Sequence, residues 1–139
     1  MSKFDKQRQR LADIFGTESV PAVKTETLER YLEHLKQTLE FPCQFTGIDD
    51  FPWEAIYVVG PGDKEEHEQL RQTKPSYLDT YELLSFDDVK SRFGIMVNVR
   101  RVSDKKTFVL PLADLKATDK KSQNYELLDD YVTWFVNWH

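Results

Sequence analysis

Three segments of the chain carry apolar residues at helical spacing. Residues 3–15 contain only a few of them, and Gly16 interrupts the pattern. Residues 25–40 contain a continuous stripe, which predicts an amphipathic helix that ends before Pro42. We expect Thr25 to be the N-cap of this helix. The stripe consists of Leu28, Tyr31, Leu32, Leu35 and Leu39.

The third helical segment, residues 124–139, has one broad apolar face and a narrow polar one. Burying several hundred Å² of that face would contribute on the order of 10 kcal/mol, at ~25 cal/mol per Å², before opposing terms. We therefore expect this helix to cover a sheet rather than to fray as a tail. The apolar face consists of Leu127, Leu128, Tyr131, Trp134, Phe135 and Trp138.

Between Pro42 and Pro111 the apolar period changes to the two-residue alternation of strands, most clearly in residues 93–101. We expect a hairpin that turns near residues 103–104, with a second strand that ends at Pro111. A polar stretch, residues 62–80, is expected to hold one or two helical turns. The other strand candidates are residues 43–48, 53–60 and 80–86.

This order of elements predicts an α+β fold. Short antiparallel strands between helices indicate a small curved antiparallel sheet or an SH3-like barrel, flanked by N-terminal helices and a C-terminal helix. We divide the chain into a helical extension, residues 1–24, and a single domain, residues 25–139.

Composition narrows the class of protein. Of 139 residues 40% are hydrophobic, which is enough for one domain with its own core and excludes a disordered chain. No run approaches the ~18 apolar residues of a membrane span, and the charged N-terminus does not resemble a secretory signal. The single cysteine, Cys43, excludes an internal disulfide, so we expect a reducing, cytoplasmic location without membrane association.

The net charge of −5 is unevenly distributed. Residues 40–88 hold twelve acidic and three basic residues, a balance of −9. This acidic segment should attract cations and repel nucleic acid. A solvated acidic surface that only keeps the protein soluble would have the same composition.

The sequence lacks the motifs that are typical of most catalytic sites. There is no glycine-rich phosphate loop, no H-E-x-x-H and no Cys-x-x-Cys, and no nucleophile–base pairing is visible, so we expect no enzymatic activity. Cys43 is interpreted as a buried small hydrophobe and His34 as a solvated residue. Four basic residues are expected to form the charged rim of the hairpin: Arg100, Arg101, Lys105 and Lys106.

Carboxylates near predicted turns are the remaining candidates for function. Ca²⁺ takes six to eight oxygen ligands, and no EF-hand loop motif is present, so a site would combine separate loops. We rank Asp49, Asp50 and Glu54 first, because no Lys or Arg lies between Gly47 and Gly62. The next candidates are Asp87 and Asp88, which have Lys90 and Arg92 nearby, and then Asp130, which can instead cap a polar stripe or pair with a basic residue of a strand.

Several motifs resemble the cyanobacterial calcium-binding protein (CcbP) family. They are FPCQFTG after an amphipathic helix, the FGIMVNVRR strand, Pro111-Leu112-Ala113-Asp114-Leu115, and the pattern Asn124-Tyr125, Asp130-Tyr131, Trp134-Phe135, Asn137. The resemblance covers roughly residues 28–139. It implies a small barrel-like fold that binds Ca²⁺ through acidic surface loops, with a buffering or signalling role and no enzymatic activity.

Two other functional classes compete with calcium binding. An acidic interaction module, either an SH3-like adaptor or an immunity-type protein that blocks a basic protein partner, explains the same charge without metal. A small hydrolase is the third hypothesis. Titration with Ca²⁺, Mg²⁺ and EDTA separates the first two.

Overall fold

The computed structural model describes residues 2–139 and contains five α-helices, five strands and two 3₁₀ helices in this part of the chain. The helices are α1 (Lys3–Phe15), α2 (Thr25–Thr38), α3 (Ala55–Val58), α4 (Lys64–Leu70) and α5 (Gln123–Asn137). The strands are β1 (Gln44–Gly47), β2 (Thr80–Lys90), β3 (Gly94–Arg101), β4 (Thr107–Pro111) and β5 (Leu115–Ala117). The 3₁₀ helices are η1 (Pro52–Glu54) and η2 (Leu112–Asp114).

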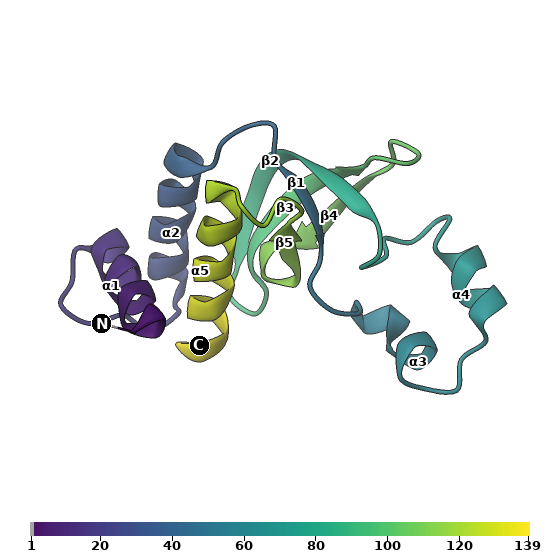
Figure 1. Cartoon of the computed structure of the whole chain (residues 1–139), viewed down its shortest axis with the longest axis horizontal. Helices are drawn as coiled ribbons and strands as arrows, with labels where there is room; N and C mark the ends of the chain where they lie inside the picture. The colour runs from purple at the N-terminus through teal and green to yellow at the C-terminus, as the bar shows by residue number, and fades with distance from the viewer. Residues whose placement is uncertain (1) are drawn as a thin grey trace.

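The five strands form one antiparallel sheet in the order β4-β3-β2-β1-β5 (Figure 1). The α+β class, the curved sheet and the flanking helices are therefore as predicted. The sheet is open, with β4 and β5 at its two edges, rather than closed into a barrel.

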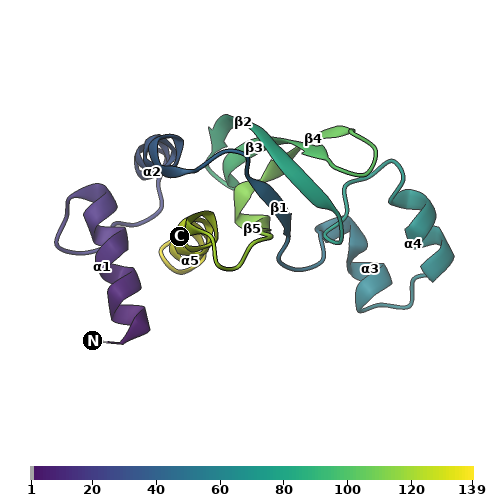
Figure 2. The ribbon, with the colours of Figure 1, turned by 45° about the horizontal axis from the view of Figure 1, so that its top comes forward.

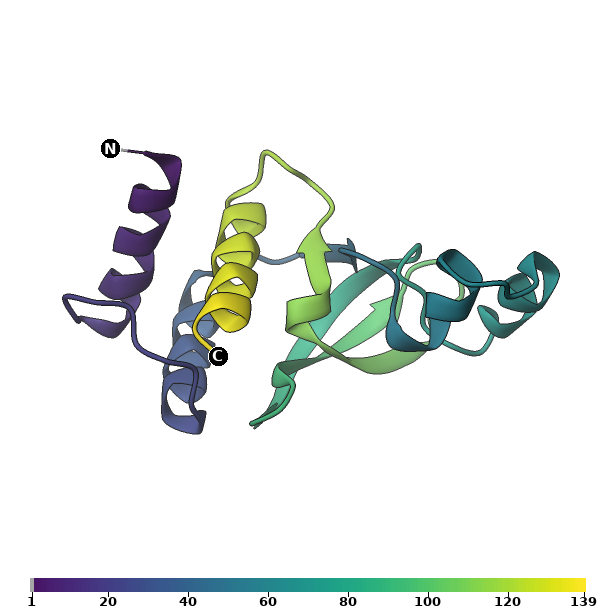
Figure 3. The same ribbon diagram turned by 90° about the horizontal axis from the view of Figure 1, so that it is seen from below.

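The helices form two groups at opposite ends of the molecule. Helix α5 packs against β5 and η2, and α2 contacts β2 and β3 (Figures 1 and 3). Helix α1 lies outside these two and contacts both. Helices α3 and α4 project from the other end of the sheet (Figure 2). We call residues 51–79, which include η1, α3 and α4, the lobe.

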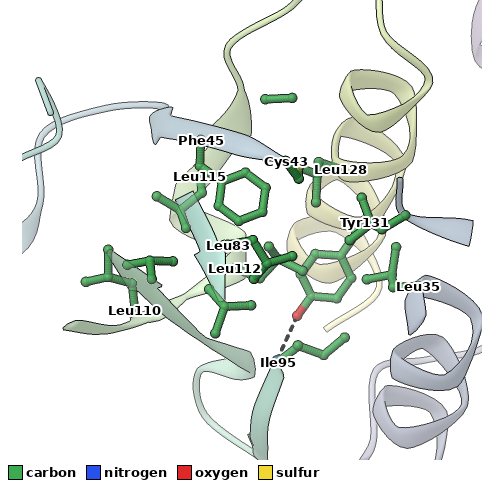
Figure 4. Close-up of a cluster of buried hydrophobic side chains, with 14 of the residues drawn as sticks. Leu35, Cys43, Phe45, Leu83, Ile95, Leu110, Leu112, Leu115, Leu128 and Tyr131 are labelled. Atoms are coloured by element: carbon green, nitrogen blue, oxygen red, sulfur yellow. Dashed lines mark hydrogen bonds between the residues drawn. The ribbon is translucent and has the colours of Figure 1, made fainter. Parts of the chain in front are cut away.

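The aromatic face of α5 is buried, as predicted for a helix that covers the sheet. Trp134 and Tyr131 are fully buried, and both lie close to the ring of Tyr31 from α2. The Trp134 indole N–H donates to the carbonyl of Pro21, 2.9 Å away, and the Ile95 N–H donates to the Tyr131 hydroxyl oxygen at 2.9 Å (Figure 4). The polar atoms of Trp134 and Tyr131 are thus tied to backbone groups, whereas the buried Tyr31 hydroxyl has no hydrogen-bond partner among the described residues.

Helix α1 belongs to the same packed end. Ser2 caps it through a capping box, and Gly16 ends it in the left-handed conformation with φ 65°. Leu11 is fully buried between the helices. The predicted helical extension, of which the structure describes residues 2–24, therefore contributes to the core through Leu11.

One predicted strand is wrong. Residues 53–60 form the end of η1 and the helix α3, followed by a turn. Pro52 occupies the first turn of η1, where its fixed φ suits a helical start, and Glu54 turns back to accept a hydrogen bond from the Phe51 N–H. The apolar side chains that suggested a strand here are largely exposed, so local capping, rather than burial in the sheet, decides the conformation of this segment.

Three further details differ from the sequence interpretation. The N-cap of α2 is Lys24, whose N–H donates to the Thr27 hydroxyl at 2.8 Å, rather than Thr25. Strand β2 runs on to Lys90, and its pairing with β3 has two irregularities. The short strand β5 was not predicted, because three residues are too few to show a period.

Candidate metal centre

Glu54, a predicted ligand, is completely buried, and both of its oxygens accept hydrogen bonds. Its Oε1 accepts from the Tyr77 N–H at 2.8 Å and the Phe51 N–H at 3.4 Å. Its Oε2 accepts from the Ser76 hydroxyl at 2.6 Å and lies 2.8 Å from His67 Nε2. A metal could reach this carboxylate only after these contacts had broken.

The contacts of Glu54 join parts of the lobe that are distant in sequence. His67 brings in α4, and its ring stacks on Tyr57 of α3 with an interplanar angle of 4°. The Trp53 indole N–H donates to the Pro75 carbonyl at 2.7 Å. Glu54 is thus the centre of the network that folds the lobe.

Asp49 and Asp50 lie in the loop that leads from β1 into the lobe. Asp49 is exposed and Asp50 is half-buried. None of the ion pairs within residues 2–139 involves either carboxylate. These two carboxylates are therefore accessible to a cation, but Glu54 points away into its own network.

Asp87 and Asp88 lie at a β-bulge in strand β2. The strand pairing passes from Phe86 to Val89 on β2 while β3 advances by only two residues, which leaves the two aspartates opposite one residue. The usual alternation of side chains is thereby broken, and both aspartates border one groove together with Glu29 of α2. The groove is also lined by Leu32, Lys36, Phe86 and Val89.

Asp130, the third candidate, is engaged by helix α1. Arg10 donates to both of its oxygens, each at 2.9 Å, and the Gln7 amide donates to Oδ1 at 2.9 Å. This hydrogen-bonded pair raises the pKa of Arg10 above its ordinary value. Sequence reasoning allowed Asp130 a basic partner on a strand, but the partner is Arg10 on helix α1, and the carboxylate is buried.

The predicted ligands thus fall into separate places. Asp87 and Asp88 share a groove, Asp49 and Asp50 share a loop, and Glu54 and Asp130 are in the interior. Within residues 2–139, no group of three or more His, Cys, Asp or Glu side chains is placed to hold a metal ion. The carboxylates at the surface would need oxygens from water or the backbone to complete a calcium site.

Arg101 has a role that sequence reasoning missed. It was expected on a basic rim, but its side chain is buried and donates to Asp79, to Asp104 and to the carbonyls of Arg71, Gln72 and Lys74. The hydrogen bond from Arg101 lowers the pKa of Asp104 to about 2. The one signal in the sequence is that Arg101 falls on the same side of the strand as Val97 and Val99, which are buried.

The interpretation of Cys43 as a buried hydrophobe agrees with the structure. The thiol is buried, and burial raises its pKa to about 11, which leaves it protonated and unreactive at neutral pH. His34 is half-buried rather than solvated, and this burial lowers its pKa.

None of the helices in residues 2–139 combines the length and apolarity that a membrane span requires. Two solved structures resemble the chain, each with a TM-score of 0.59. One is "The crystal structure of Anabaena CcbP", at 19% identity over 96% of this chain and 92% of that one. The other is "Calcium binding protein in the calcium-binding form", at 18% identity over 98% and 96%.

At these identities the two structures establish the fold alone. A search among curated proteins gave no significant match. The profile of one protein family, Calci_bind_CcbP, described as "Calcium binding", matches residues 22–135. That match spans β1–β5, both candidate carboxylate pairs and most of α5. The chain therefore belongs to the CcbP family of calcium-binding proteins.

Proposed function

We propose that this protein binds Ca²⁺ through surface carboxylates, without an EF-hand and without catalysis, as a buffer or a sensor. Membership of the calcium-binding family is the observation that carries this proposal. The acidic balance of residues 40–88 supports it, because a concentrated negative potential raises the local cation concentration.

We place the calcium site at the groove between α2 and β2, which Glu29, Asp87 and Asp88 border. The bulge in β2 supports this choice, because it brings both aspartates to one groove. Asp88 and Glu29 are exposed, so the fold does not have to open before they bind an ion. Lys36 borders the same groove, and the three carboxylates outnumber it.

Asp49 and Asp50 are the second choice. They lie in a loop whose backbone carbonyls can add ligands, but Glu54, the third residue predicted with them, is held in its own buried network. Glu54 and Asp130 are left out of the proposed set, because each would have to give up strong internal contacts to bind a metal.

Calorimetric titration of EDTA-treated protein with CaCl₂ tests this proposal. We expect heat of binding in the wild type and its loss in Asp87→Asn/Asp88→Asn. Mg²⁺ should bind much more weakly, because surface groups of this kind do not offer the octahedral geometry that it demands.

Two matched variants serve as controls. Glu65→Gln/Glu66→Gln removes two adjacent exposed charges from the same acidic segment and should retain binding. Loss of binding only in Asp49→Asn/Asp50→Asn would move the site to the loop. No binding by the wild type at low salt would reject the calcium proposal and favour an acidic interaction module.

A further inference from the structure

The lobe exposes an apolar ridge, which consists of Ile56, Val58 and Val59. These side chains are 54%, 40% and 82% exposed, although they fall within four consecutive residues. Ile56 and Val59 are three residues apart in a helical turn and so lie on the same face. A run of exposed apolar residues is disfavoured unless it has a function, whereas isolated ones are ordinary.

The exposure of the ridge is fixed by the packing behind it. On the inner side of α3, Tyr57 stacks on His67 with ring centroids 5.2 Å apart, and Trp53 contacts both rings. His67 is in turn held by the buried carboxylate of Glu54. The ridge therefore faces outward because the opposite side of the helix is anchored.

Negative charge predominates in the part of the chain that contains the ridge. Residues 48–68 contain six solvent-accessible carboxylates and one lysine. The pKa of the Tyr57 hydroxyl is raised, first by partial burial and then by Glu66 and Asp63, so these two carboxylates act on the hydroxyl end of Tyr57. The six acidic residues are Asp49, Asp50, Asp63, Glu65, Glu66 and Glu68.

The basic residues that follow α4 do not neutralise this surface. Arg71 pairs with Asp79 at 3.0 Å, and the Lys74 ammonium lies over the Trp53 ring. The lobe also lies at the end of the molecule away from α1, α2 and α5, where those helices cannot cover it (Figure 2). A partner would find the ridge accessible, in a part of the lobe whose exposed charges are mostly carboxylates.

We propose that the ridge is a docking surface for a basic amphipathic helical segment of another protein. The apolar side of that segment would cover Ile56 and Val59, and its Lys and Arg residues would meet the surrounding carboxylates. A second copy of this chain is disfavoured as the occupant, because the same acidic residues would face each other across the interface. The proposal does not depend on calcium.

A synthetic amphipathic helical peptide of leucine and lysine is a suitable probe. It should bind the full chain in the presence of EDTA, with an affinity that falls as salt is raised. Ile56→Ser/Val59→Ser should weaken binding roughly tenfold or more, because central apolar contacts dominate such interfaces. Val136→Ser, at an exposed site on α5, should leave the affinity unchanged.

A peptide in which glutamate replaces lysine should not bind. The proposal is overturned if the lysine peptide fails to bind the wild type, or if it binds the ridge variant as tightly as the wild type. It is also overturned if sedimentation shows a wild-type dimer that the ridge variant loses, because the occupant would then be a second copy. EDTA keeps each of these outcomes independent of the calcium titration.

Discussion

The helical end of the molecule and the lobe are stabilised in different ways. At the helical end, Tyr31, Tyr131 and Trp134 are fully buried, and their polar atoms play a secondary part. In the lobe no residue of α3 or α4 is buried, and the buried groups include Glu54 and Ser76, joined by a hydrogen bond. One region depends on apolar area and the other on a polar network.

This difference has a physical consequence for how each region responds to change. Apolar packing is non-directional, so its loss is felt as lost area and a cavity. A buried polar network depends on complete pairing, and one missing partner leaves others unsatisfied. We expect mutations to destabilise the whole fold in the first region and to act locally in the second.

The largest effect is expected at the helical end. Trp134→Ala should reduce the free energy of unfolding by roughly 3–5 kcal/mol, because it removes a fully buried aromatic side chain and leaves a cavity. Denaturant titration monitored by circular dichroism measures this loss. Val136→Ala, on the exposed side of the same helix, is the control and should change little. A small loss for Trp134→Ala would contradict the dominance of apolar packing here.

A smaller and more local effect is expected at Glu54. Glu54→Gln should cost about 1–3 kcal/mol, because the amide turns an N–H₂ group toward donors that need an acceptor. Hydrogen exchange should accelerate in residues 51–79 and stay slow in β3 and α5. Exchange that accelerates equally in both regions would contradict a local effect of Glu54. Glu65→Gln, at an exposed residue of the lobe, is the control.

The smallest effect is expected on acidification, at the ion pair between Arg101 and Asp104. The Arg101 guanidinium holds the pKa of Asp104 at about 2, below its value of about 4 in an unfolded chain. The stabilisation from this pair is therefore complete above about pH 4 and is lost as the pH falls toward 2. Asp104 is partly exposed, so solvent screens the pair and we expect a modest change in Tm.

Thermal unfolding of the wild type and of Asp104→Asn measures this contribution. The difference in Tm should be constant above about pH 4 and should shrink below it. A difference in Tm that persists at pH 2 would show that Asp104 acts through its shape rather than its charge.

The helical end was also the part that the sequence predicted best. Leu28, Tyr31 and Leu35 form a stripe at helical spacing, and the second half of β3 alternates, with Val97 and Val99 on its inward face. These signals are local repeats, so they can be read without knowing what the element packs against.

The lobe and the candidate site could not be read in this way. The apolar residues Ile56, Val58 and Val59 have the composition of a buried strand, and only the capping by Glu54 and Pro52 makes them helical. The engagement of Glu54 with Ser76 and of Asp130 with Arg10 depends on contacts between residues 22 and 120 positions apart. The sequence alone does not distinguish an acidic residue that accepts several hydrogen bonds in the interior from one that stays at the surface.

The close approach of Gly47 to Tyr77 bears on how this protein could be re-engineered. The Gly47 N–H donates to the Tyr77 carbonyl at 3.0 Å, and a Cβ on Gly47 would lie 2.5 Å from the Cβ of Tyr77. The chain thus leaves and re-enters the sheet at one point, where Thr46 pairs with Thr80 across β1 and β2. A short turn grafted between these strands would excise the lobe while preserving the ladder, and it would release position 47 from its need for glycine.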